Sequence, residues 1–136
     1  MTDFDFKEDI SYETAKLLKS KGFDGFVRAY YDDNRCGTIR PIFGLPILAT
    51  ELEAKKYPLA SCLYVNHWLS LTHNLYVSPY FCSLGWYFEV YDTSDCDTTG
   101  CKPLYQIGIP DSESVFNSVD EAFDKGIAYA LRNFVK

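Results

Sequence analysis

The sequence contains no long apolar run, no cluster of basic residues and few histidines. Its 136 residues include 2 His, and 13 Lys plus Arg stand against 19 Asp plus Glu, which gives a net charge of −6. A general nucleic-acid binder needs clustered Lys and Arg to neutralise phosphates, so this composition argues against nucleic acid as a partner. The longest strongly apolar stretch, Tyr80 to Phe88, is much shorter than the roughly 20 residues that cross a bilayer, and we expect no membrane partner.

The N-terminal residues also lack the cationic and apolar blocks of a secretory signal, so we expect no export by that route. The five cysteines form an odd set without a CxxC pair, which favours reduced thiols over a disulfide framework. Together these absences predict a cytoplasmic protein. The cysteines are Cys36, Cys62, Cys82, Cys96 and Cys101.

Motifs for nucleotide or cofactor chemistry are also missing. The 8 glycines form no phosphate-binding loop and there is no GxSxG elbow, so we expect no cofactor. His67 and His73 are too far apart in sequence to share one helical face as the two ligands of a zincin do. A catalytic pair of Cys62 or Cys82 with one of these histidines stays open, because such partners meet in space. A small Cys/His- or metal-dependent enzyme is therefore the alternative class of function.

Aromatic residues are what the sequence has in quantity, with 10 Phe, 11 Tyr and 2 Trp. Hydrophobic residues make up 47% of the chain, which is enough to build one core without metal or disulfide crosslinks. This length and composition predict a single globular domain over residues 1–136.

Capping residues and apolar periodicity predict three helices, at Ser11 to Lys21, Pro58 to His73 and Ser118 to the C-terminus. Gly22 and Asn74 are expected to end the first two. Alternating residues predict strands at Phe26 to Tyr31, Leu75 to Cys82, Gly85 to Asp92 and Pro103 to Ile109. Residues 35–57 are expected to be mostly irregular, and Asp92 to Lys102 is expected to form a loop.

The last helix has the clearest pattern. Ser118 and Glu121 form a capping box, and an apolar stripe follows from Val119 to Phe134. This stripe must cover an apolar surface, and the inward face of the strand that carries Phe88 is the obvious partner. We therefore expect an α+β fold: a two-layer domain in which an antiparallel sheet of three to four strands packs with about three helices, in the order α-β-α-β-β-β-α.

Five stretches of this chain are considered together: Ile10 to Phe23, Ala29 to Asp32, Trp68-Leu69 with His73-Asn74, Trp86 to Tyr91 and Ser118 to Leu131. In these stretches the chain resembles small, mostly uncharacterised proteins of phages and prophages of gut Bacteroidales. The resemblance implies a phage-related accessory protein that acts in the cytoplasm of a bacterial host, and it brings no established activity.

Two adjacent predicted strands place four tyrosines on one face of the sheet. Tyr76, Tyr80, Tyr87 and Tyr91 share the same parity, and Glu89 lies among them. Tyrosine-rich surfaces are typical of protein interfaces, so this face is the candidate partner-binding site. The alternative is that another helix covers the face and that the hydroxyls bond locally.

The segment that begins at Asp95 resembles the start of a calcium loop. Asp95, Asp97, Thr99 and Gly100 match its first, third, fifth and sixth positions, but Gln106 replaces the bidentate Glu at the end. Asp95, Asp97 and Thr99 are thus the candidate metal ligands. A hairpin loop rich in Asp, Thr and Gly is the simpler interpretation.

The sequence as a whole favours a non-enzymatic phage or prophage accessory protein. It would bind a protein partner or associate with itself through its aromatic surface. Antagonism of a host defence factor is a specific form of this hypothesis, and it rests on the resemblance and on the small size of the chain.

Overall fold

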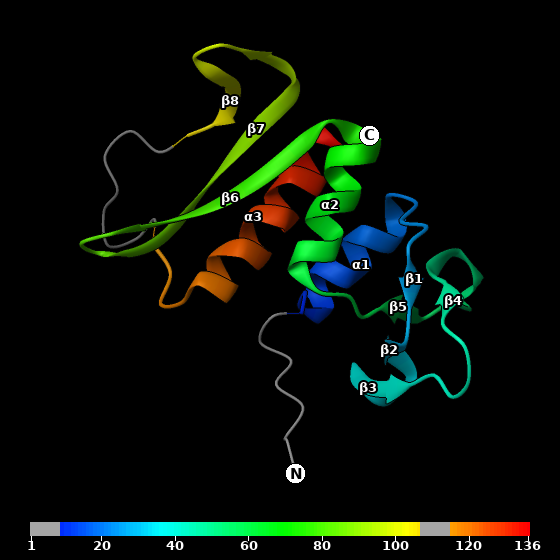
Figure 1. The fold of residues 1–136 in the computed structure, drawn as a ribbon. Helices are drawn as coiled ribbons and strands as arrows, with labels where there is room; N and C mark the ends of the chain where they lie inside the picture. Colours follow the sequence, from blue (N-terminus) through cyan, green and yellow to red (C-terminus); the bar gives the residue numbers. More distant parts are fainter. Residues whose placement is uncertain (1–8, 107–114) are drawn as a thin grey trace.

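A computed structural model describes residues 9–106 and 115–136, and within them the expected α+β class is confirmed. All strands pair antiparallel (Figure 1). The helices are α1 (Tyr12–Ser20), α2 (Cys62–His73) and α3 (Val119–Phe134), and the largest sheet contains β6 (Leu75–Cys82), β7 (Gly85–Asp97) and β8 (Gly100–Tyr105). A smaller sheet has the order β3 (Thr38–Pro41), β2 (Ala29–Asp32) and β5 (Lys56–Pro58), and β1 (Phe26–Val27) pairs with β4 (Ile47–Leu48).

The ends of α1 are set by residues that the sequence identifies. The Ser11 hydroxyl accepts the Thr14 N–H at the start of the helix. At its end Gly22 has φ +81°, and the N–H of Phe23 donates to the Leu18 carbonyl in a Schellman ending. Leu18 and Phe23 are both buried, so the local termination signal also contributes to the core.

Helix α2 begins later than predicted. Pro58 belongs to β5, where it pairs with Tyr30, and Ser61 is the N-cap. Proline is tolerated there because β5 is an edge strand and the missing N–H breaks no ladder bond. The predicted end of the helix is confirmed, since Asn74 is left-handed with φ 56°. Apolar periodicity does not decide burial at every position of this helix, since Leu63 is 73% exposed.

Residues 35–57 are more regular than predicted. They contain β3, β4, the start of β5 and a short 3-10 helix, η3 (Ala49–Glu51). These strands are two to four residues long, and two of them pair with β2 across intervening sequence. The partners of β4 and β5 lie far back in the chain, at β1 and β2, which explains why local pattern did not reveal these two strands.

The central hairpin has the predicted connection. Ser83 and Leu84 join β6 to β7, and the register runs from Leu75 opposite Asp92 to Cys82 opposite Gly85. The predicted loop from Asp92 to Lys102 is wrong, because β7 continues to Asp97 and pairs with β8. The strand predicted from Pro103 to Ile109 accordingly begins earlier, at Gly100, and its predicted end from Ile107 to Ile109 lies outside the described residues.

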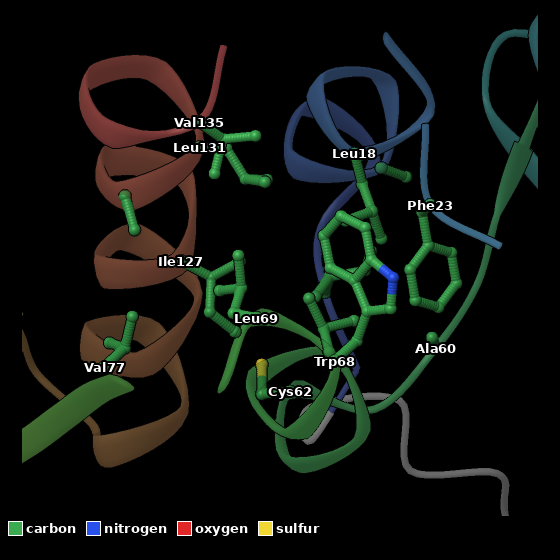
Figure 2. Packing of buried hydrophobic residues seen from close by; sticks show 14 of the residues in the cluster. Leu18, Phe23, Ala60, Cys62, Trp68, Leu69, Val77, Ile127, Leu131 and Val135 are labelled. Carbon is green, nitrogen blue, oxygen red and sulfur yellow. The ribbon is translucent and has the colours of Figure 1, made fainter. Parts of the chain in front are cut away.

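Helix α3 packs on the predicted face of this sheet. Its Gly126 lies so close to β6 and β7 that a Cβ there would be 2.5 Å from Val77 Cγ1 and 2.9 Å from Phe88 Cγ. Figure 2 shows Ile127 and Leu131 of α3 pointing toward the side of the core that α2 and α1 occupy. The core therefore lies between α3, the other two helices and one face of the sheet. In the described part of the chain, no helix combines the length and apolarity needed to cross a membrane.

A buried side-chain amide joins α2 to the edge of the sheet. Asn66 Nδ2 donates to the Val77 carbonyl at 3.0 Å, and the Val77 N–H donates to Asn66 Oδ1 at 2.9 Å. Because β6 is the edge strand, Asn66 supplies the two hydrogen bonds that a further strand would supply.

Replacement of Gly126 by Ala tests the close contact of α3. Alanine raises helix propensity by about 1 kcal/mol, but overpacking costs about 1–3 kcal/mol, so we expect a net loss of stability. Urea unfolding should show a lower midpoint for Gly126→Ala and little change for the exposed neighbour variant Lys125→Ala. A more stable Gly126→Ala protein would contradict the contact.

Replacement of Asn66 by Ala tests the edge contact. Two buried backbone groups of Val77 would lose their partners, at about 1–3 kcal/mol each. We expect the free energy of unfolding to fall by about 2–4 kcal/mol, measured by denaturant titration, whereas His67→Ala, at the exposed next position, should be nearly neutral. Equal effects of the two variants would refute the bridging role.

Candidate functional site

The tyrosine face lies on the side of the sheet opposite α3. Tyr76 and Tyr80 are 46% and 38% exposed, and Tyr87 and Tyr91 are half-buried. Helix α3 packs instead against Val77 and the other inward residues of β6 and β7. Among the described residues no helix lies over the tyrosines, so the face is available to solvent.

Glu89 is the exception on this face, because its side chain is buried at 6% exposure. The Tyr91 hydroxyl donates to Glu89 Oε1 at 2.9 Å, and the hydroxyls of Tyr80 and Tyr91 are 3.3 Å apart. Tyr80 also stacks on Tyr87 with ring centroids 5.7 Å apart. Three of the four predicted tyrosines, Tyr80, Tyr87 and Tyr91, therefore form one contiguous cluster with the buried carboxylate of Glu89.

The hydrogen bonds of this cluster have a defined direction. An ionised carboxylate only accepts, so Tyr91 donates to Glu89, and Tyr80 must then donate to Tyr91. The hydrogen bond with Tyr80, burial and the interactions with Glu89 raise the pKa of Tyr91 well above its usual range. Burial and the nearby Glu89 charge also raise the pKa of Tyr87. Both hydroxyls thus stay protonated at neutral pH.

A hollow of about 420 Å³ opens beside this cluster. Two register shifts in β7, between Val90 and Tyr91 and between Asp92 and Cys96, precede the end of the β7–β8 hairpin. Residues of that hairpin end line the hollow together with the sheet. The lining residues are Tyr76, Ser78, Tyr80, Tyr91 and Thr93 from β6 and β7, and Thr99, Gly100 and Cys101 from the hairpin end.

The predicted metal residues lie at this hairpin end, and two of them have a structural role there. Asp97 Oδ1 accepts the Thr99 N–H at 2.7 Å and the Thr99 hydroxyl at 2.5 Å. These bonds lower the pKa of Asp97. Asp95 is exposed, and the described residues contain no group of three or more His, Cys, Asp or Glu placed to hold a metal ion. The calcium site therefore stays a prediction that this geometry does not favour.

A disulfide joins Cys96 to Cys101 across the hairpin. This corrects the prediction of five reduced thiols, and the inference of a cytoplasmic location loses the argument that rested on them. The two residues are five positions apart and become neighbours only when β7 pairs with β8. A search for CxxC motifs cannot detect such a pair.

The hollow beside the tyrosines is lined by none of the Cys and His residues of the alternative enzyme hypothesis, which are Cys62, Cys82, His67 and His73. His67 is exposed, and the ring of His73 packs edge-on against Trp68 with centroids 4.9 Å apart. Cys62 is buried in the hydrophobic core (Figure 2). Neither histidine is among the residues that line the hollow beside Tyr80 and Tyr91, nor does either line the groove between β1 and the start of α2.

A second surface, an apolar groove of about 830 Å³, lies at the other end of the molecule. It runs between β1, the segment before β4 and the start of α2, and its exposed residues include Phe26, Leu45 and Tyr64. Sequence reasoning missed it because Leu45 lies in the segment expected to be irregular. The signal that could have found it is the apolar run from Ile42 to Leu48, which forms only one short strand.

Comparison with known proteins adds no relative: no family model matches the chain, and neither a curated protein nor a solved structure matches it.

The disulfide gives a direct prediction. The chain-entropy model assigns a short closed loop of this size about 2 kcal/mol of stabilisation. Reduction should therefore lower the free energy of unfolding of the native sequence by up to that amount, and it should leave a Cys96→Ser/Cys101→Ser variant unchanged. Alkylation of the denatured protein, read by mass spectrometry, should find two fewer thiols before reduction than after it. Equal thiol counts would contradict the crosslink.

Proposed function

We propose that this protein is a non-enzymatic binding module that contacts a partner protein through the tyrosine face of its β6–β7 sheet. The observation that supports the proposal is that Tyr76, Tyr80 and Tyr91 line a hollow of about 420 Å³ on a sheet face that the described helices leave open. Tyrosine provides large contact area together with a hydrogen-bonding tip, and for this reason it is enriched at protein interfaces.

The biological setting is part of the same proposal. A phage or prophage accessory role, in the cytoplasm of a bacterial host, follows from the sequence resemblance alone. Antagonism of a host defence factor is its most specific form. Self-association is the version with the fewest components, since it needs no second gene product.

A selection from a yeast-displayed library of random peptides tests the binding face. Peptides that bind the native protein should bind a Tyr76→Ala/Tyr80→Ala variant at least about tenfold more weakly, since central aromatic residues of an interface often contribute more than 1.4 kcal/mol. The matched control is Phe43→Ala/Leu45→Ala, which removes two exposed apolar residues far from the tyrosines.

The control variant also identifies the competing surface. Selected peptides that lose binding to Phe43→Ala/Leu45→Ala, but not to the tyrosine variant, would move the interface to the apolar groove and refute the proposal. Sedimentation velocity of both variants tests self-association, because a dimer formed through the tyrosine face should dissociate only when the tyrosines are removed.

A further inference from the structure

We propose that the hollow beside Tyr80 and Tyr91 receives the ammonium group of a lysine side chain from a partner protein. This inference rests on the proposed function and names the chemistry of the partner. It follows from the charge of the site, the direction of its hydrogen bonds and the aromatic rings that surround it.

Glu89 places a buried carboxylate behind Tyr91, one of the residues that line the hollow. A carboxylate that is 6% exposed carries a desolvation cost unless it is paired or fully hydrogen-bonded. Among residues 9–106 and 115–136, the ion pairs join Lys16 to Glu13, Arg35 to Asp32 and Lys56 to Glu53, so none of them involves Glu89. The residues that line the hollow include no Lys, Arg or His. Glu89 does not itself line the hollow, but it accepts the hydrogen bond of Tyr91, which does, so a negative charge lies behind a wall that carries no cation.

The hydroxyls of Tyr80 and Tyr91 determine which hydrogen bonds they can offer to a ligand in the hollow. Tyr91 uses its proton on Glu89, and Tyr80 uses its proton on Tyr91. The oxygen of Tyr80 then has only lone pairs left, so this end of the Tyr80–Tyr91–Glu89 hydrogen-bond network accepts hydrogen bonds and donates none. The ammonium of lysine carries three donors and no acceptor, which complements this arrangement.

Three tyrosine rings form part of the wall of the hollow. Tyr76, Tyr80 and Tyr91 all line the hollow, and the face of a tyrosine ring attracts a cation within about 6 Å of its centroid. The same chain already pairs lysine with tyrosine elsewhere: Lys16 Nζ lies 4.7 Å from the centroid of Tyr12, and Lys56 Nζ lies 5.1 Å from that of Tyr30. Tyrosine rings in the wall, with the Glu89 carboxylate behind Tyr91, favour an ammonium group over neutral or anionic groups.

Titration with hexalysine, followed by NMR of the backbone amides, tests the inference. We expect shifts at residues 76–80 and 89–93, and none with hexaglutamate. Glu89→Gln keeps the shape and removes the charge, so it should weaken hexalysine binding by roughly tenfold, because the ammonium loses the attraction of the nearby carboxylate. Glu13→Gln is the matched control, because it removes the same charge from an exposed position, and it should change affinity less than about twofold.

Two further variants keep the test decisive if Glu89→Gln unfolds. Tyr91→Phe retains the ring and removes the hydroxyl that connects Tyr80 to Glu89. We expect a several-fold loss of affinity for hexalysine. Ser94→Ala, on the same strand but outside the hollow, should have no effect. Equal hexalysine affinities for the native, Glu89→Gln and Tyr91→Phe proteins would overturn the inference.

The remaining outcomes separate this inference from the proposed function. Peptides that depend on Tyr76 and Tyr80 but bind Glu89→Gln unchanged would keep the tyrosine interface and overturn the lysine site. n-Butylammonium that binds as tightly as hexalysine would overturn the protein partner in favour of a small amine. Loss of hexalysine binding in both Glu89→Gln and Tyr91→Phe, with the Glu13→Gln and Ser94→Ala controls unchanged, would support the site.

Discussion

The close approach of α3 to the sheet at Gly126 is the constraint on which the rest of the structure depends. A helix that presents no Cβ at this point can lie directly on Val77 and Phe88. The apolar stripe of α3 is therefore buried along most of the helix. The same helix contacts β6, β7, α1 and α2. Asp124, two residues before the close contact on α3, accepts the N–H of Ser11 at 2.8 Å and so joins the start of α1 to the same helix.

Packing on one side of the sheet determines what the other side can do. An antiparallel sheet can leave one face in water, and such a face is usually polar and fully solvated. Here the open face instead contains a buried carboxylate, Glu89, enclosed by tyrosines. A buried charge does not contribute to folding as an apolar side chain would. The proposed binding role of this face accounts for its presence.

The parts of the fold that could be predicted are those decided by neighbouring residues. Ser11 and Gly22 delimit α1, and the alternation along β6 and β7 identified both the core face and the tyrosine face. The parts that could not be predicted depend on distant partners. Tyr31 pairs with Tyr57, and Cys96 meets Cys101 only after the hairpin forms. Parity likewise placed Glu89 among the tyrosines, but its burial depends on how the surrounding rings pack, which no local pattern encodes.

Strand β7 connects the two halves of this arrangement, because its adjacent residues Phe88 and Glu89 point to opposite faces. A shift of one residue in its register would exchange the core face for the tyrosine face, and contact with Gly126 of α3 prevents that shift at Phe88. Beyond Val90 no such contact with Gly126 applies, and both register shifts of the strand occur there. Bulges bend a strand and re-aim its side chains. The strand that anchors the core thus also directs the hairpin end toward the tyrosines, so the shape of the hollow depends on the packing of α3 on the opposite face.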